Sequence, residues 1–132
     1  MNKLFESIEP YAGLIGRVLI AVLFVLSGWS KIGGYAGTQG YMQSAGVPGG
    51  LLPLVIVLEL GGGLAIIAGF YTRVVALLLA GFTVLTALLF HTGADQIQQI
   101  MFMKNLGLTG GFLFLFANGA GRLSVDHLLK RA

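Results

Sequence analysis

The chain has 132 residues, of which 56% are hydrophobic and only 10% are charged. Soluble domains carry about 25% charged residues, so this composition excludes a soluble domain and predicts a membrane protein. The net charge of +3 is too small and too dispersed to predict nucleic-acid binding, and the absence of cysteine excludes disulfides and thiolate metal sites.

Four apolar segments are long enough to cross the hydrocarbon core of a bilayer, which takes about 17–25 residues of helix. They predict an all-α membrane protein, a four-transmembrane-helix bundle that forms a single domain over residues 1–132. The expected helices cover residues 11–31, 51–70, 73–91 and 102–118. The first segment contains Arg17 and lacks a small-residue cleavage site, so we interpret it as a transmembrane helix and not as a signal peptide.

Basic residues indicate how the bundle is oriented. Four spans place both termini on one side of the membrane, and Lys3, Arg73, Arg122 and Lys130 fall on that side. The opposite side has Lys31 as its main basic residue. The positive-inside rule therefore predicts a multi-pass membrane protein with both termini in the cytoplasm.

The two connections on the outer side have an interfacial character. Tyr35 and Tyr41 lie between glycine and proline residues, and tyrosine is favoured at the membrane–water interface. We expect a short amphipathic helix there, and a second interfacial segment over residues 92–100, where polar residues alternate with isoleucine.

Glu59 is the single ionisable residue between Leu51 and Gly69. A carboxylate near the centre of a membrane helix costs about 2.5–3.5 kcal/mol even on insertion scales. A buried Glu59 therefore needs a partner, and Lys31 or Lys104 would offset the desolvation of both charges.

Helix geometry gathers the polar side chains in one half of the bundle. At 1.5 Å per residue, Glu59 lies about 12 Å below the outer end of its helix. The outer ends of the first, third and fourth helices carry the other polar residues of the group, except Arg17. The predicted polar cluster or ligand-binding site contains Glu59, Lys31, Lys104, Asn105, His91 and Arg17. Arg17 is the exception, because it falls toward the inner half, where Glu6 or Glu9 reaches it only if the N-terminal segment folds back.

Every member of this cluster except Asn105 also has a purely structural interpretation. Lys31, Lys104 and Arg17 can extend to the headgroups, His91 can lie at the interface, and Glu59 can form a structural ion pair. The two histidines are too far apart in the topology to hold a haem, so we expect no metal and assign no catalytic residue. Lysine, histidine and glutamate beside apolar walls suit a quinone carbonyl, but they suit an ion or a small solute equally well.

Several motifs together resemble the DoxX family of small inner-membrane proteins. They are Gly28-Trp-Ser-Lys31, Glu59-Leu-Gly-Gly-Gly63, Gly69-Phe-Tyr-Thr-Arg73 and Met103-Lys104-Asn105-Leu106. The resemblance implies a four-helix membrane protein related to subunits of quinol oxidases, with quinone as the cofactor. The family pattern is matched at Arg17, Lys31, Glu59, Arg73, Lys104 and Asn105.

Three functions stay open at this point. The first is a quinone-linked oxidoreductase subunit that depends on a redox partner protein. The second is a non-enzymatic scaffold that holds lipid or a partner helix, and the third is a small transporter. A monomer of this size is small for a carrier, so we expect a homo-oligomer in contact with membrane lipid.

Overall fold

The computed structural model describes residues 2–130 and confirms the all-α class, with no strand in that range. Four helical spans within it are long and apolar enough to cross a membrane. The first, third and fourth are α1 (Asn2–Gly33), α5 (Thr72–Phe90) and α6 (Gln96–Asn118). The second span is made of η1 (Gly49–Leu51), α3 (Leu52–Ile56), η2 (Val57–Gly61) and α4 (Gly62–Ala68). Two short helices, α2 (Tyr35–Ser44) and α7 (Val125–Leu128), lie outside the spans.

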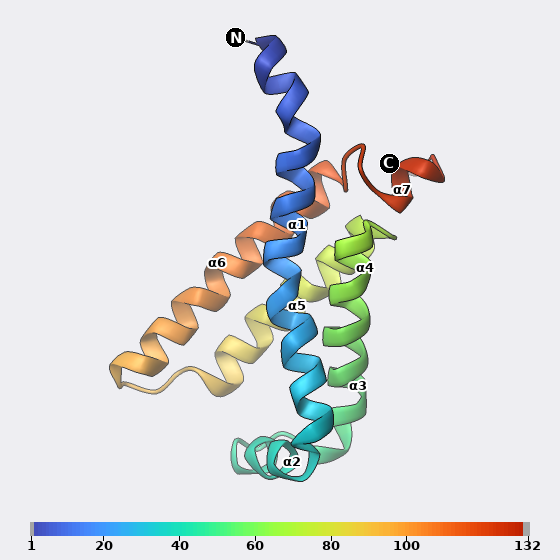
Figure 1. The fold of residues 1–132 in the computed structure, drawn as a ribbon. Helices are drawn as coiled ribbons and strands as arrows, with labels where there is room; N and C mark the ends of the chain where they lie inside the picture. Colours follow the sequence, from blue (N-terminus) through green and yellow to red (C-terminus); the bar gives the residue numbers. More distant parts are fainter. Residues whose placement is uncertain (1, 131–132) are drawn as a thin grey trace.

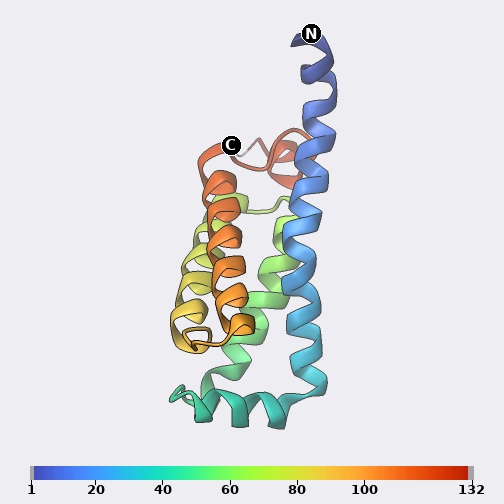
Figure 2. The same ribbon diagram turned by 90° about the vertical axis from the view of Figure 1, so that its left-hand side faces the viewer.

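The spans form two antiparallel hairpins (Figure 1). In one, α1 packs against the second span, and in the other, α5 packs against α6. Between the hairpins lies a core of buried residues, Ala21, Phe24, Ile66, Leu79 and Phe112. We call the end of the bundle that carries α2 and the α5–α6 connection the α2 end, and the opposite end the termini end (Figures 1 and 2).

Two glycines let α1 and the second span approach closely. A Cβ atom on Gly28 would lie 2.9 Å from the backbone nitrogen of Leu60, and one on Gly63 would lie 2.8 Å from a methyl group of Val25. Side chains at these two positions would force the helices apart. Small residues at such crossings are the usual means by which membrane helices pack.

Helix α1 begins at Asn2, nine residues before the expected start, and projects beyond the other spans at the termini end (Figure 2). Its 32 residues are about 48 Å long, whereas the hydrocarbon core is about 30 Å thick. The helix continues through Pro10, which has no N–H to bond the carbonyl of Glu6. Arg122 supplies the missing donor, because its Nη2 lies 3.2 Å from that oxygen.

Helix α2 is the short helix expected in the first connection. The second connection differs from expectation, because residues 92–95 form a loop and α6 already begins at Gln96. The reason is an N-cap: the side chain of Asp95 accepts a 2.8 Å hydrogen bond from the backbone nitrogen of Gln98. The polar residues 96–100 are therefore the first turns of the fourth span.

Candidate functional site

Glu59 lies in η2, a π-helical turn that interrupts the second span. In such a turn each N–H bonds the carbonyl five residues back, and these turns are frequent at functional sites. The Glu59 side chain is buried against α1, and the residue is 5% exposed. The residues themselves gave no sign of the π-turn, because sequence periodicity alone does not separate it from a continuous α-helix.

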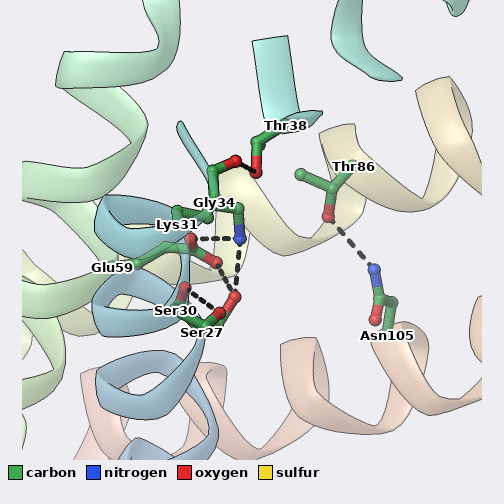
Figure 3. A network of polar contacts seen from close by, with 8 residues as sticks. All are labelled: Ser27, Ser30, Lys31, Gly34, Thr38, Glu59, Thr86 and Asn105. Atoms are coloured by element: carbon green, nitrogen blue, oxygen red, sulfur yellow. Dashed lines mark hydrogen bonds and ion pairs between the residues drawn. The ribbon is translucent and has the colours of Figure 1, made fainter. Parts of the chain in front are cut away.

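Lys31 is the partner of Glu59. Its Nζ lies 2.6 Å from Glu59 Oε1, and the same ammonium donates a 2.6 Å hydrogen bond to the hydroxyl of Ser27 (Figure 3). Ser27 in turn donates to Glu59 Oε2 over 3.1 Å. Both carboxylate oxygens and the ammonium are thus engaged, which offsets the desolvation of the two charges. Of the two lysines that we considered as partners, Lys31 makes the contact and Lys104 does not.

Ser27 completes this group, and sequence reasoning missed it. It lies four residues before Lys31 on α1, so the two side chains share one face of the helix. That spacing could have predicted the role of Ser27. A hydroxyl one helical turn from Lys31, on the face toward Glu59, can bond both members of the ion pair.

The ion pair forms part of the wall of a cavity of about 440 Å³ at the α2 end. All the spans and α2 contribute to this wall, which is mostly made of leucine, phenylalanine, valine and methionine side chains. The polar residues that line it are Ser27, Lys31, Thr38, Tyr41, Glu59, Thr83, Thr86, His91, Lys104 and Asn105. Five of the six residues predicted for the site therefore line one cavity.

Asn105 lies on the opposite side of this space from the ion pair (Figure 3). Its Nδ2 donates to the carbonyl of Thr83 over 3.3 Å and to the hydroxyl of Thr86 over 3.1 Å. These bonds fix α6 to α5 inside the membrane and orient the amide. No described residue donates to the Oδ1 of Asn105, so that oxygen is available to a ligand.

His91 and Lys104 line the cavity without touching Glu59. The Nδ1 of His91 lies 3.1 Å from Gln98 Oε1, which ties the end of α5 to the first turn of α6. The Nζ of Lys104 has the sulfur of Met101 at 3.8 Å as its hydrogen-bond partner. A thioether is a weak acceptor, so the ammonium of Lys104 keeps nearly its full capacity to donate.

Arg17 does not belong to this cavity. It is 2% exposed and lies toward the termini end, where Nη1 donates to the carbonyls of Ile66 and Ile67 over 3.2 and 3.1 Å. Its Nη2 donates to the carbonyl of Leu123. The N-terminal segment does not fold back to bring Glu6 or Glu9 to this guanidinium, because α1 is continuous from Asn2.

Asp126 is the acid that accompanies Arg17, and the two attract each other electrostatically. Its carboxylate accepts 2.8 Å hydrogen bonds from the backbone nitrogens of Tyr71 and Thr72, at the start of α5. Its own backbone nitrogen donates to the carbonyl of Gly69 over 2.8 Å. Sequence reasoning missed Asp126 because it lies in a polar tail, where no apolar periodicity indicates that it is 4% exposed.

The match to the DoxX family model covers residues 12–92, which is more than half of the chain. The chain belongs to the DoxX family. It is 54% identical to Inner membrane protein YqjF of Escherichia coli (strain K12) over 127 residues, which cover 96% of this chain and 98% of that protein. The resemblance inferred from the motifs is confirmed.

Two further relatives extend the comparison. Inner membrane protein YphA of Escherichia coli (strain K12) is 34% identical over 131 residues, with 93% of this chain and 94% of that protein covered. A Bacillus subtilis (strain 168) protein named "Putative oxidoreductase CatD" is 35% identical over 80 residues, with 61% of this chain and 57% of that protein covered. No solved structure gives a significant match. The chain is thus a DoxX protein of the inner membrane with four apolar helices long enough to cross it.

Proposed function

We propose that this DoxX protein binds the head group of a quinone or quinol in the cavity at the α2 end, as the membrane subunit of an oxidoreductase. The observation that carries the proposal is the ion pair between buried Glu59 and partly buried Lys31 at the wall of an apolar cavity. Ligand sites commonly have volumes of about 300–1,000 Å³, apolar walls and a few placed polar groups, and the cavity of about 440 Å³ matches that description.

The polar groups of the cavity suit the shape of a quinone ring. A quinone has two carbonyl oxygens on opposite edges of a flat apolar ring. On one side of the cavity Lys31 keeps one N–H donor, because its bonds to Glu59 and Ser27 use the other two. Lys104, next to Asn105 in the sequence of α6, supplies a further donor. Phe24 and Phe82 are among the apolar residues that would contact the ring between them.

An isoprenoid tail also has a route out of the cavity. Leu54 and Leu85 line it and are more than half exposed on surfaces that face lipid in a membrane-spanning bundle. The ligand would then enter from the bilayer, as expected for a molecule too apolar to arrive through water.

The oxidoreductase part of the proposal takes support from the name of CatD and needs a partner protein to exchange electrons. Within residues 2–130 no group of three histidine, aspartate or glutamate side chains is placed to hold a metal ion. In this proposal the chain binds the ligand, and the partner protein exchanges the electrons. We also propose that both termini are cytoplasmic, which puts the cavity in the outer half of the membrane, and that the chain forms a homo-oligomer.

A carrier function has less support from the structure. Between the cavity and the termini end, Ala21, Phe24 and Ile66 are buried in a packed core, and beyond them Arg17 is bound to three backbone carbonyls. A solute would have to break these contacts to cross.

A lipid-binding scaffold uses the same cavity as the proposed quinone site, so the binding experiment has to separate those two ligands.

The test measures binding of a short-chain ubiquinone and, separately, of a phospholipid of similar length to the purified protein. We expect the quinone to bind, and Lys31→Met and Glu59→Gln to weaken its binding about 10-fold or more, because the first removes the ammonium and the second removes the negative charge that pairs with it. Arg73→Met is the matched control, since Arg73 is an exposed cation at the other end of the bundle. Saturable binding of the phospholipid alone would replace the quinone proposal with the lipid-binding function.

A further inference from the structure

The charges around the cavity do not balance. The ionisable side chains that line it are Lys31, Tyr41, Glu59, His91 and Lys104. Lys31 and Glu59 neutralise each other across 2.6 Å. Lys104 has no such partner, because in the described part of the chain no carboxylate lies within ion-pairing distance of its Nζ.

The remaining two groups do not supply the missing negative charge. Tyr41 stacks on Phe90 with ring centroids 5.3 Å apart, and a phenol is neutral at physiological pH. His91 has Nδ1 bonded to Gln98, and histidine is either neutral or positive. The described side chains that line the cavity therefore include two lysines and one carboxylate, Glu59.

An ammonium that no carboxylate neutralises, at the edge of an apolar cavity, favours the binding of an anionic ligand. Lys104 is itself exposed and reaches the cavity from its rim, so its charge attracts an anion because no carboxylate of residues 2–130 pairs with it, and not because it is buried. Lysine has a flexible four-carbon stem, and Lys104 is fixed only by a weak contact to a thioether at 3.8 Å. Its ammonium can turn toward an acidic group on a bound ring.

We infer that the cavity selects the singly anionic form of its ligand, and that Lys104 is the residue that sets this preference. The ligand class is a flat ring that carries both a carbonyl and an ionised hydroxyl, such as the anion of a hydroxyquinone. In this arrangement the Lys31–Glu59 pair receives the neutral carbonyl and Lys104 receives the anionic oxygen. The inference rests on the proposed quinone site, and it adds a charge state and a specificity residue to it.

The experiment compares two probes of nearly equal shape in the full-length purified protein. Lawsone is a hydroxynaphthoquinone whose hydroxyl is ionised at neutral pH, and its methyl ether is neutral. We expect the wild-type protein to bind lawsone about 10-fold more tightly than the ether. In Lys104→Met the ratio should fall to about one, whereas Lys104→Arg should keep it, because arginine retains the charge. Lys3→Met is the control, since Lys3 is an exposed lysine at the far end of α1.

The ratio of two affinities is measured within one protein sample, so partial unfolding of a variant does not produce the expected result. Equal binding of the two probes by the wild-type protein would overturn the inference and leave the quinone site standing. A preference that survives in Lys104→Met, or disappears in Lys104→Arg, would overturn the role of the Lys104 charge. Failure of both probes to bind would overturn the proposed function together with the inference.

Discussion

The bundle holds a buried cation, Arg17, toward one end and a partly buried one, Lys31, toward the other, and the two are held in different ways. Arg17, toward the termini end, donates to three backbone carbonyls, and Asp126 beside it accepts from two backbone nitrogens. Lys31, toward the α2 end, is bound by the side chains of Glu59 and Ser27. A cavity lies beside Lys31, and the residues that line it do not include Arg17.

The difference separates a structural charge from one that is available to a ligand. Backbone groups cannot be withdrawn without breaking helices, so the partners of Arg17 are fixed when the chain folds. Side-chain partners can rotate and exchange bonds with a bound molecule. Burial alone does not distinguish these two roles, because Arg17 and Glu59 are both almost inaccessible. The bonding partners of a charged group do distinguish them.

The largest effect is expected for Arg17→Met. The substitution leaves the carbonyls of Ile66, Ile67 and Leu123 without this donor and removes the cation that faces Asp126. Breaking a buried charge network in this way costs about 3–5 kcal/mol. Thermal or denaturant unfolding in detergent would measure the loss, with exposed Arg73→Met as the control. A loss no larger than that of the control would remove the contrast between the two ends.

A smaller loss is expected for Asp126→Ala. It leaves the backbone nitrogens of Tyr71 and Thr72 without their acceptor at the start of α5. The cost should be about 2–3 kcal/mol, since each unsatisfied buried donor costs about 1–3 kcal/mol. Unfolding measurements alongside Asp95→Ala, which removes an exposed N-cap, would show whether the tail residue matters more than an ordinary cap.

The smallest effect on stability is expected for the double substitution Lys31→Met with Glu59→Leu. Replacing both members of a buried ion pair with apolar residues is often neutral or stabilising, so the free energy of unfolding should change by no more than about 1 kcal/mol. Lys31→Met alone should destabilise the protein more, because Glu59 then lacks its cation. If the double variant unfolds as easily as Arg17→Met does, the Lys31–Glu59 pair contributes as much to the stability of the fold as Arg17 does.

Apolar segment lengths were sufficient to predict the class of the fold and the existence of the four spans. The start of α1 was not predictable in this way, because residues 2–10 are amphipathic rather than apolar and contain Pro10. That helix continues because a residue more than 100 positions away, Arg122, bonds the carbonyl that proline leaves free. Long-range contacts of this kind leave no local pattern in the sequence.

Some residues of the candidate site could be predicted from the sequence and others could not, because long-range contacts leave no local pattern. Glu59 was found because a carboxylate in an apolar span is costly, and Lys31 because helix geometry put it at the right depth. Asp126 was missed, and Arg17 was grouped with the wrong partners, because both depend on where the C-terminal segment lies. Residues within spans can be placed by counting, whereas the position of a tail depends on the completed fold.

The two polar contacts of α1 also restrict how the protein can move. Lys31 and Arg17 are 14 residues apart, about 21 Å on α1, while their partners Glu59 and Ile66 are seven residues apart, about 10 Å on the second span. Two long side chains, one from the middle of α1 and one near its end, thus reach toward each other, with the close contacts of Gly28 and Gly63 between them. This first hairpin cannot slide or separate without breaking an ionic contact, so it behaves as a rigid frame. Any opening of the cavity would then involve α2 and the α5–α6 hairpin, which supply the rest of its wall.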